Sequence, residues 1–221
     1  QAPIQIQQKE QTKGKEEKIL KVEVIEWDER ARRFLFETRK YTQIPEFLNK
    51  LRIHKDEKKW EAYGVKDVMG NWHVRNFNRN NQLKMIVRQN ANAGNMYSLF
   101  RTKDDNKNAI VVEGLHDAVA VYNMFKNKFD IICLNSVSNV YKAIKELEKY
   151  KHIYIATDND VAGRKARDIL LHELKKSAHT IYDVQFQSKD IDEAFRNQEQ
   201  ITTNNIFSSF SFDSNFDSLD M

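Results

Sequence analysis

Acidic residues follow three apolar runs in the second half of the chain, and their types and spacing could bind a metal ion. Glu113 ends the run NAIVVEG, Asp158 and Asp160 follow HIYIAT, and Asp190 and Asp192 come after TIYDVQF. These runs, together with FDIICLN, alternate with amphipathic helical patterns, which predicts a parallel sheet with helices packed on it. Because ligand sites in such sheets lie at the carboxyl ends of the strands, we expect the acids to converge at one edge.

The expected cluster also contains Asp117, three residues after Gly114. Close carboxylates repel one another unless a cation cancels their charge, and Mg²⁺ is the usual choice where phosphates are handled. The alternative is that a lone Asp-x-Asp is a helix N-cap with a solvated neighbour. We expect Mg²⁺ or Mn²⁺ to be held by the full set, Glu113, Asp117, Asp158, Asp160, Asp190 and Asp192.

Two of these stretches, VVEGLHD and IATDNDVAGRKA, resemble the motifs of the Toprim domain. In that domain one strand ends in Glu-Gly, and a later strand ends in Asp-x-Asp followed by Ala-Gly. The resemblance covers about residues 106–197 and implies an α/β fold with a Rossmann-like parallel sheet and flanking helices. Asp117 and the stretch KDIDEAF further resemble bacterial, DnaG-type primases of the plasmid, phage or mobile-element kind.

The primase resemblance implies Mg²⁺-dependent synthesis of short primers from nucleoside triphosphates on a single-stranded DNA template. It implies that Glu113, Asp158 and Asp160 are catalytic, with Glu113 as general acid/base, and that Arg164 and Lys165 contact phosphate. Two alternatives stay open: a Toprim nuclease that uses water as the nucleophile, and a non-catalytic single-strand-binding accessory protein of replication or mobilisation.

A basic segment precedes the acidic one. From Lys66 to Lys103 there are seven Lys or Arg residues and one acid, with Trp72, His73, Phe77 and Tyr97 interleaved. Cations that follow phosphates and rings that stack on bases suit a single strand. The alternative is a solvated sheet face whose aromatic residues lie in the core. We expect nucleic-acid contacts from Lys66, Arg75, Arg79, Lys84, Arg88 and Arg101.

Composition shifts divide the chain into four parts. Residues 1–18 are predicted to be a flexible linker, 19–105 a smaller basic α+β subdomain, 106–197 the Toprim domain, and 198–221 a flexible Phe/Asp-rich tail that could bind a replicative helicase. Within the subdomain, ILKVEVIEW is interpreted as a strand or a helix entry. The stretches ERARRFLFETRKYT and IPEFLNKLRI predict two helices, and the stretch from Trp60 to Arg101 predicts an antiparallel meander.

The whole chain of 221 residues has a net charge of +4, and Cys133 is its single cysteine. One cysteine excludes a disulfide framework within the chain and argues against a zinc site, so the zinc module that usually opens such primases is not expected here. Cys133 is interpreted as a small buried hydrophobe.

No run of about 18 apolar residues or signal peptide is visible, so we expect a cytoplasmic protein without a membrane span. Among the histidines, His116 near Glu113 is a candidate for the site.

Overall fold

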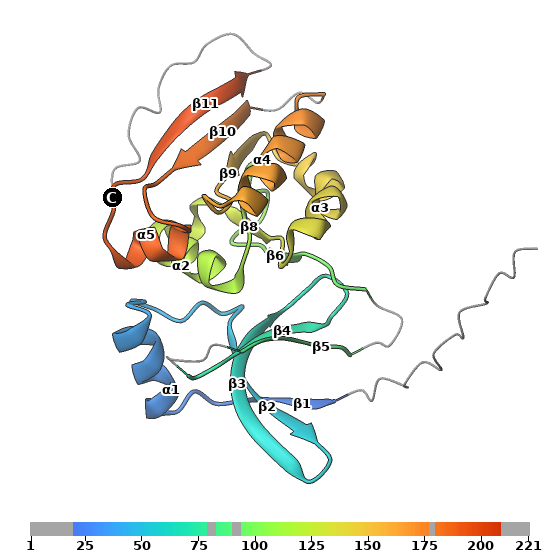
Figure 1. Cartoon of the computed structure of the whole chain (residues 1–221), viewed down its shortest axis with the longest axis vertical. Coiled ribbons are helices and arrows are strands. Elements are labelled where there is room, and N and C mark those ends of the chain that lie inside the picture. The colour runs from blue at the N-terminus through green and yellow to red at the C-terminus, as the bar shows by residue number, and fades with distance from the viewer. Residues whose placement is uncertain (1–19, 79–82, 90–93, 177–179, 209–221) are drawn as a thin grey trace, which may run out of the picture.

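The computed structural model describes residues 20–78, 83–89, 94–176 and 180–208. This part of the chain forms two β-sheets, of five and six strands. Figure 1 shows the N-terminal sheet below the C-terminal sheet, with helices on both sides of the latter. No helix in these ranges is long and apolar enough to cross a membrane.

The N-terminal sheet is antiparallel throughout, in the order β1-β2-β3-β4-β5. The predicted meander is confirmed as far as Val87, and of the two interpretations of ILKVEVIEW the strand is the one found. The first predicted helix is also confirmed: it begins as α1, Glu29–Arg33, and continues as a π-helix over Phe34–Thr38. The strands are β1 Lys21–Ile25, β2 Asn49–Lys55, β3 Lys58–Lys66, β4 Trp72–Asn76 and β5 Lys84–Val87.

The second predicted helix, over IPEFLNKLRI, is wrong. The chain turns at Pro45 and continues as β2, in which Leu51 and Ile53 are fully buried. These residues alternate with Lys50 and Arg52, and such a period of two places them on one face of a strand. The apolar spacing of the stretch satisfied a helical pattern too, and pairing with both β1 and β3 decides for the strand.

The C-terminal sheet has the order β11-β10-β9-β7-β8-β6, and its four central strands are parallel. This arrangement confirms the predicted alternation of strands and helices. The parallel strands are β7 Asn108–Val112, β8 Asp130–Cys133, β9 His152–Ile155 and β10 Thr180–Gln185. The helices are α2 Leu115–Phe125, α3 Val140–Leu147, α4 Val161–Leu174 and α5 Ile191–Arg196, with short 3₁₀ turns at Lys126–Lys128 and Val137–Asn139.

Both faces of the central strands are covered. In β7, Ile110 and Val112 join a cluster that includes α2 and the N-terminal sheet, whereas Ala109 and Val111 join a cluster with α3 and α4. The N-terminal sheet therefore shares its main core with the α2 face of the C-terminal sheet. Burying each large side chain contributes roughly 1.5–3 kcal/mol, so this shared core fixes the two parts together.

Both edge strands of this sheet differ from the sequence prediction. β6, Ser98–Phe100, was expected in the first meander but pairs with β8. β11, Thr202–Ser208, falls in the segment expected to be a flexible tail and pairs antiparallel with β10. An edge strand has one solvent-facing side and can be largely polar, so its sequence shows little apolar pattern. Residues 1–18 and 209–221 lie outside the described residues.

The aromatic residues of the basic segment are in the core. Trp72, His73 and Tyr97 are buried, and Phe77 packs edge-on against Trp27 and Phe34. The expectation that these rings form a stacking surface for bases is therefore wrong. The rings belong to three different clusters of the core: Trp72 packs within the N-terminal sheet, Tyr97 packs with α3 and α4, and Phe77 lies against the core that the two sheets share.

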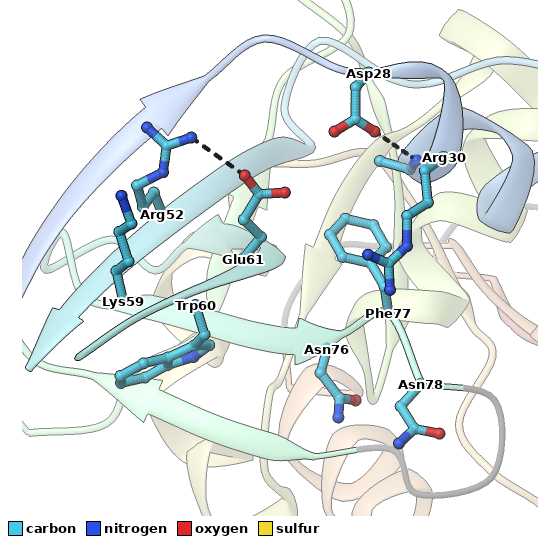
Figure 2. Close-up of a pocket in the computed structure, with 10 residues that line it drawn as sticks. Asp28, Arg30, Arg52, Lys59, Trp60, Glu61, Asn76, Phe77 and Asn78 are labelled. Atoms are coloured by element: carbon cyan, nitrogen blue, oxygen red, sulfur yellow. Dashed lines mark hydrogen bonds and ion pairs between the residues drawn. The ribbon is translucent and has the colours of Figure 1, made fainter.

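A hollow of about 640 Å³ opens between α1 and the N-terminal sheet (Figure 2). Its two acids, Asp28 and Glu61, both accept hydrogen bonds from the buried ammonium of Lys50, and Arg52 also pairs with Glu61. Since their charges are cancelled within the protein, this hollow has no carboxylate left to bind a cation. The acids predicted to do so lie elsewhere.

Candidate active site

The carboxyl ends of the parallel strands form one wall of a pocket of about 540 Å³. Glu113 directly follows β7, Asp158 follows β9, and Asp190 follows β10 through a short loop. Five of the six predicted acids line this pocket: Glu113, Asp117, Asp158, Asp190 and Asp192. Convergence at one sheet edge agrees with the expectation from strand order.

The sixth acid, Asp160, caps α4 beside the pocket, and its carboxylate accepts a hydrogen bond from the Gly163 amide at 2.9 Å. The N-cap alternative therefore describes part of its role. Its charge nevertheless acts on the pocket, because it contributes to raising the pKa of both Glu113 and Asp158. Asp190 caps α5 in the same way and accepts from Glu193 N at 2.8 Å.

Burial and the neighbouring carboxylates both disfavour the ionised form of the pocket acids. Burial and the nearby charges of Glu113, Asp190 and Asp160 raise the pKa of Asp158 to about 7. Burial also raises the pKa of Glu113 and of Asp190. A divalent cation bound by oxygen ligands would relieve this repulsion, so the donor set fits Mg²⁺ or Mn²⁺.

The carboxylates of the pocket are not arranged as ligands around one ion position. Within the described ranges, no three Asp, Glu, His or Cys side chains stand together as ready-made ligands of one ion. One reason is that backbone amides hold them: Glu113 Oε1 accepts from Asp158 N at 3.0 Å, and Asp117 Oδ2 accepts from Gly114 N at 2.8 Å. Binding an ion would require these side chains to rotate.

Asp192 has a different environment from the other acids. It is buried, its Oδ2 pairs with both Arg39 and Arg196, and its Oδ1 accepts from Tyr41 OH at 2.8 Å. Both oxygens are thus already used by protein donors, which suits a residue that organises the pocket wall. Asp117 is also buried, and burial with the nearby Asp158 raises its pKa well above the usual range.

Gly163 allows α4 to begin against the acids. A Cβ at this position would lie 2.1 Å from the carbonyl oxygen of Asp158 and 2.6 Å from Oε1 of Glu113. No side chain fits at those distances. Gly163, the glycine of the Ala-Gly pair in the Toprim-like motif, therefore leaves the room that the helix needs to begin at this point.

The opposite wall of the pocket is basic. Arg75 on β4 and Lys84 on β5 are cross-strand partners, and both line the pocket. Two further cations of the lining, Arg39 and Arg196, were not singled out from the sequence. Arg39 lies 153 residues from its partner Asp192, so no local spacing could reveal the pair.

The remaining basic residues predicted to bind nucleic acid do not join this wall. Lys66 lies over the Trp72 ring, 4.9 Å from its centroid, and Arg88 is exposed. Arg101 pairs with Glu146 at 2.9 Å and approaches Asp130, which begins β8, so it lies at the amino edge of the sheet, away from the pocket. Arg79 is outside the described residues.

The two predicted phosphate-binding residues, Arg164 and Lys165, are exposed in the first turn of α4 and do not line the pocket. The guanidinium of Arg164 donates to the Asn159 carbonyl. Their contact with phosphate stays a prediction.

His116 is part of the pocket lining, and its Nε2 lies 2.8 Å from the Tyr63 hydroxyl. Burial, with Arg39 and Arg75 nearby, lowers the pKa of His116 well below its usual range, so the ring is neutral at pH 7. It joins α2 to β3 across the two sheets. Cys133 is buried, as predicted.

Fold and site define an α/β protein with an acidic pocket at the carboxyl edge of its parallel sheet, faced by a basic wall from a second sheet. Residues 110–195 match the family described as Toprim-like. The Toprim resemblance of this segment is thereby confirmed. No curated protein matches the chain in sequence.

Solved structures of primase cores share the fold, and three of them show the likeness. The DnaG catalytic core has a TM-score of 0.55 at 16% identity, over 78% of this chain and 70% of that chain. The DnaG primase catalytic domain bound to ssDNA has a TM-score of 0.51 at 15% identity, over 77% and 68%. The primase fragment of the bacteriophage T7 primase-helicase protein has a TM-score of 0.50 at 19% identity, over 67% of this chain and 63% of that chain. The chain therefore has the fold of primase catalytic cores.

Proposed function

We propose that this chain is the catalytic core of a primase-type nucleotidyltransferase that synthesises short primers on a single-stranded DNA template. The observation that carries the proposal is the pocket with Glu113, Asp158 and Asp190 on one wall and Arg75 and Lys84 on the other. Acids alone would suit a metal ion, and cations alone would suit a phosphate. Facing each other, they suit a metal-bound triphosphate.

Mg²⁺ or Mn²⁺ would be held by Glu113, Asp158, Asp160 and Asp190, with Asp117 behind them. When bound, the ion would neutralise phosphate charge and stabilise the charge that develops in the transition state. Asp192 would act indirectly, since its two arginines and Tyr41 already occupy its oxygens.

The basic wall would bind the triphosphate and the template. Arg75 and Lys84 point into the pocket from neighbouring strands of the N-terminal sheet. Arg39 and Arg196 line the pocket beside Asp192, and their two charges exceed the single charge of the carboxylate with which they pair. Phosphate groups would be held between the walls, with the reacting phosphorus close to the carboxylates.

Glu113 is the proposed general base. In primer extension, the 3′ hydroxyl oxygen forms a bond to the α-phosphorus, the bond to the β-phosphate oxygen breaks, and pyrophosphate leaves. The Glu113 carboxylate would accept the hydroxyl proton. Its raised pKa supports this role, because a base with a pKa closer to neutral takes up a proton more readily.

The test is Glu113→Gln, which keeps the shape and removes one charge and the proton acceptor. Wild type and variant are incubated with single-stranded DNA, ribonucleotides and Mg²⁺ or Mn²⁺, and both new chains and template cleavage are followed. We expect new short chains from the wild type and a loss of roughly 10²–10⁴ in rate for the variant, with strand binding retained. Asp168→Asn, an exposed acid on α4, is the control.

Template cleavage in place of synthesis, equally lost in Glu113→Gln, would assign the site to a Toprim nuclease. Strand binding without either product would favour the non-catalytic accessory role. Docking of a replicative helicase through the C-terminal segment, residues 198–221, and a cytoplasmic location stay predictions.

A further inference from the structure

The loop that carries Asp190 into the pocket is held from two sides. It consists of Phe186–Lys189, between β10 and α5, and Asp190 follows it as the cap of α5. Asp190 and Asp158 line the same pocket, and the charge of Asp190 contributes to the raised pKa of Asp158. Two like charges at this range push the loop away from the sheet edge, so something must hold it in place.

Asn159 makes the first set of contacts. Its backbone amide donates to the Lys189 carbonyl at 2.8 Å, and its side-chain amide donates to the carbonyls of Ser188 at 2.7 Å and Phe186 at 3.0 Å. Asn159 lies between Asp158 and Asp160. The segment that carries Asp158 and Asp160 is therefore hydrogen-bonded directly to the loop that precedes Asp190.

Glu199 makes the second set, from the opposite end of α5. Its Oε2 accepts from the amides of Gln187 at 2.9 Å and Ser188 at 3.0 Å, and its Oε1 accepts from the Ser188 hydroxyl. These hydrogen bonds lower the pKa of Glu199, which is therefore ionised at neutral pH. Glu199 lies outside residues 110–195, the segment that matches the Toprim-like family.

We propose that Asn159 and Glu199 are positioning residues that clamp the Phe186–Lys189 loop and so fix Asp190 opposite Asp158 for a shared divalent cation. The inference rests on the proposed function, because it assigns a purpose to the cation site. Neither residue needs to touch the ion. Residues behind metal ligands commonly change metal affinity when they are substituted.

The experiment is a calorimetric titration of the full chain with MnCl₂. Glu199→Gln keeps the size of the side chain but has one acceptor oxygen where three donors converge. Asn159→Ala removes two of the three hydrogen bonds that Asn159 donates to the loop. We expect each variant to bind Mn²⁺ roughly 10-fold or more weakly. Glu148→Gln is the matched control, since Glu148 is exposed at the end of α3 and its side chain contacts no described residue through a hydrogen bond or ion pair.

A double variant separates positioning from general stability. If Glu199 acts through Asp190, then Glu199→Gln should weaken Mn²⁺ binding in the wild-type background and add little in an Asp190→Asn background. A melting temperature lowered by Glu199→Gln with unchanged Mn²⁺ affinity would overturn the clamp. So would a full additional loss of affinity in the Asp190→Asn background.

The same proteins also separate this inference from the proposed function. Mn²⁺ binding that depends on Glu199 through Asp190, in a wild type that neither synthesises nor cleaves, supports the clamp and contradicts the primase assignment. A wild type that binds no Mn²⁺ overturns both.

Discussion

Gly163 packs directly against Glu113, so closely that a methyl group on Gly163 would lie 2.6 Å from the Glu113 carboxylate. The first turn of α4 and the end of β7 are thereby in direct contact. The same methyl group would lie 2.1 Å from the Asp158 carbonyl, which is backbone and cannot move aside alone. One glycine thus sets the spacing between the two central acids.

Gly163→Ala should therefore lower the free energy of unfolding by roughly 1–3 kcal/mol, the usual cost of overpacking. It should also lower Mg²⁺ affinity, because Glu113 and Asp158 must separate. Urea unfolding with and without Mg²⁺ measures both. Gly94→Ala is the control, since a Cβ there meets nothing within 4 Å. Equal stability of the two variants would contradict the packing argument.

Mg²⁺ or Mn²⁺ should stabilise the folded protein. An ion at ten times its dissociation constant contributes roughly 1.4 kcal/mol, which raises Tm by roughly 3–6 °C for a chain of this size. Asp158→Asn should reduce this rise and leave the metal-free protein at least as stable, because it removes a repelling charge. Thermal melts over a MgCl₂ series check this. If Mg²⁺ raised the Tm of Asp158→Asn as much as that of the wild type, Asp158 would not be a metal ligand.

The metal-free protein should lose stability as pH rises from about 4 to about 7. An unfolded Asp ionises near pH 3.9, whereas burial and the neighbouring acids raise the pKa of Asp158 to about 7. Between these values the folded state holds a proton that the unfolded state has released, so the contribution present at low pH disappears as pH rises. The Tm difference between Asp158→Asn and wild type should grow over this window and then level off. A constant difference from pH 4 to pH 8 would contradict the raised pKa.

Single-strand binding should depend on the basic wall of the pocket. Each lost phosphate contact should reduce the slope of log K against log salt by roughly 0.7. Arg75→Ala combined with Lys84→Ala should flatten the slope, whereas Arg101→Ala should not, because Arg101 pairs with Glu146 at the far edge of the sheet. Fluorescence anisotropy with a labelled oligonucleotide at several salt concentrations measures the slopes. Equal slopes for the double variant and the wild type would show that the single strand binds elsewhere.

Truncation after Gln200 should destabilise the protein. It removes β11 from the edge of β10 and Ile201 from the main core, and Ile201 alone contributes roughly 1.5–3 kcal/mol. A truncation after Ser208 keeps β11 and is the comparison. Urea unfolding of both proteins gives the difference, and equal midpoints would show that β11 adds nothing to the fold.

The sequence by itself determined the four strand–helix units of the C-terminal part and the acids at their ends. Apolar runs such as IIC of β8 are buried on both faces, and this pattern is local and needs no knowledge of partners. The order of the units then places Glu113, Asp158 and Asp190 at one edge, because parallel strands share their carboxyl side. Gly163 was likewise indicated by the motif in which it stands.

Only the tertiary structure decided which residues surround those acids. Arg39 and Asp192 meet across 153 residues, and Glu199 reaches the Asp190 loop from a segment that was expected to be a tail. Leu51 and Ile53 fit a helical or a strand pattern until β1 and β3 pair with β2. Trp72 and Tyr97 were expected on a stacking surface, with the core as the alternative, and the structure places them in the core. In each case the local sequence permits two states, and the free energy that separates them comes from contacts with distant parts of the chain.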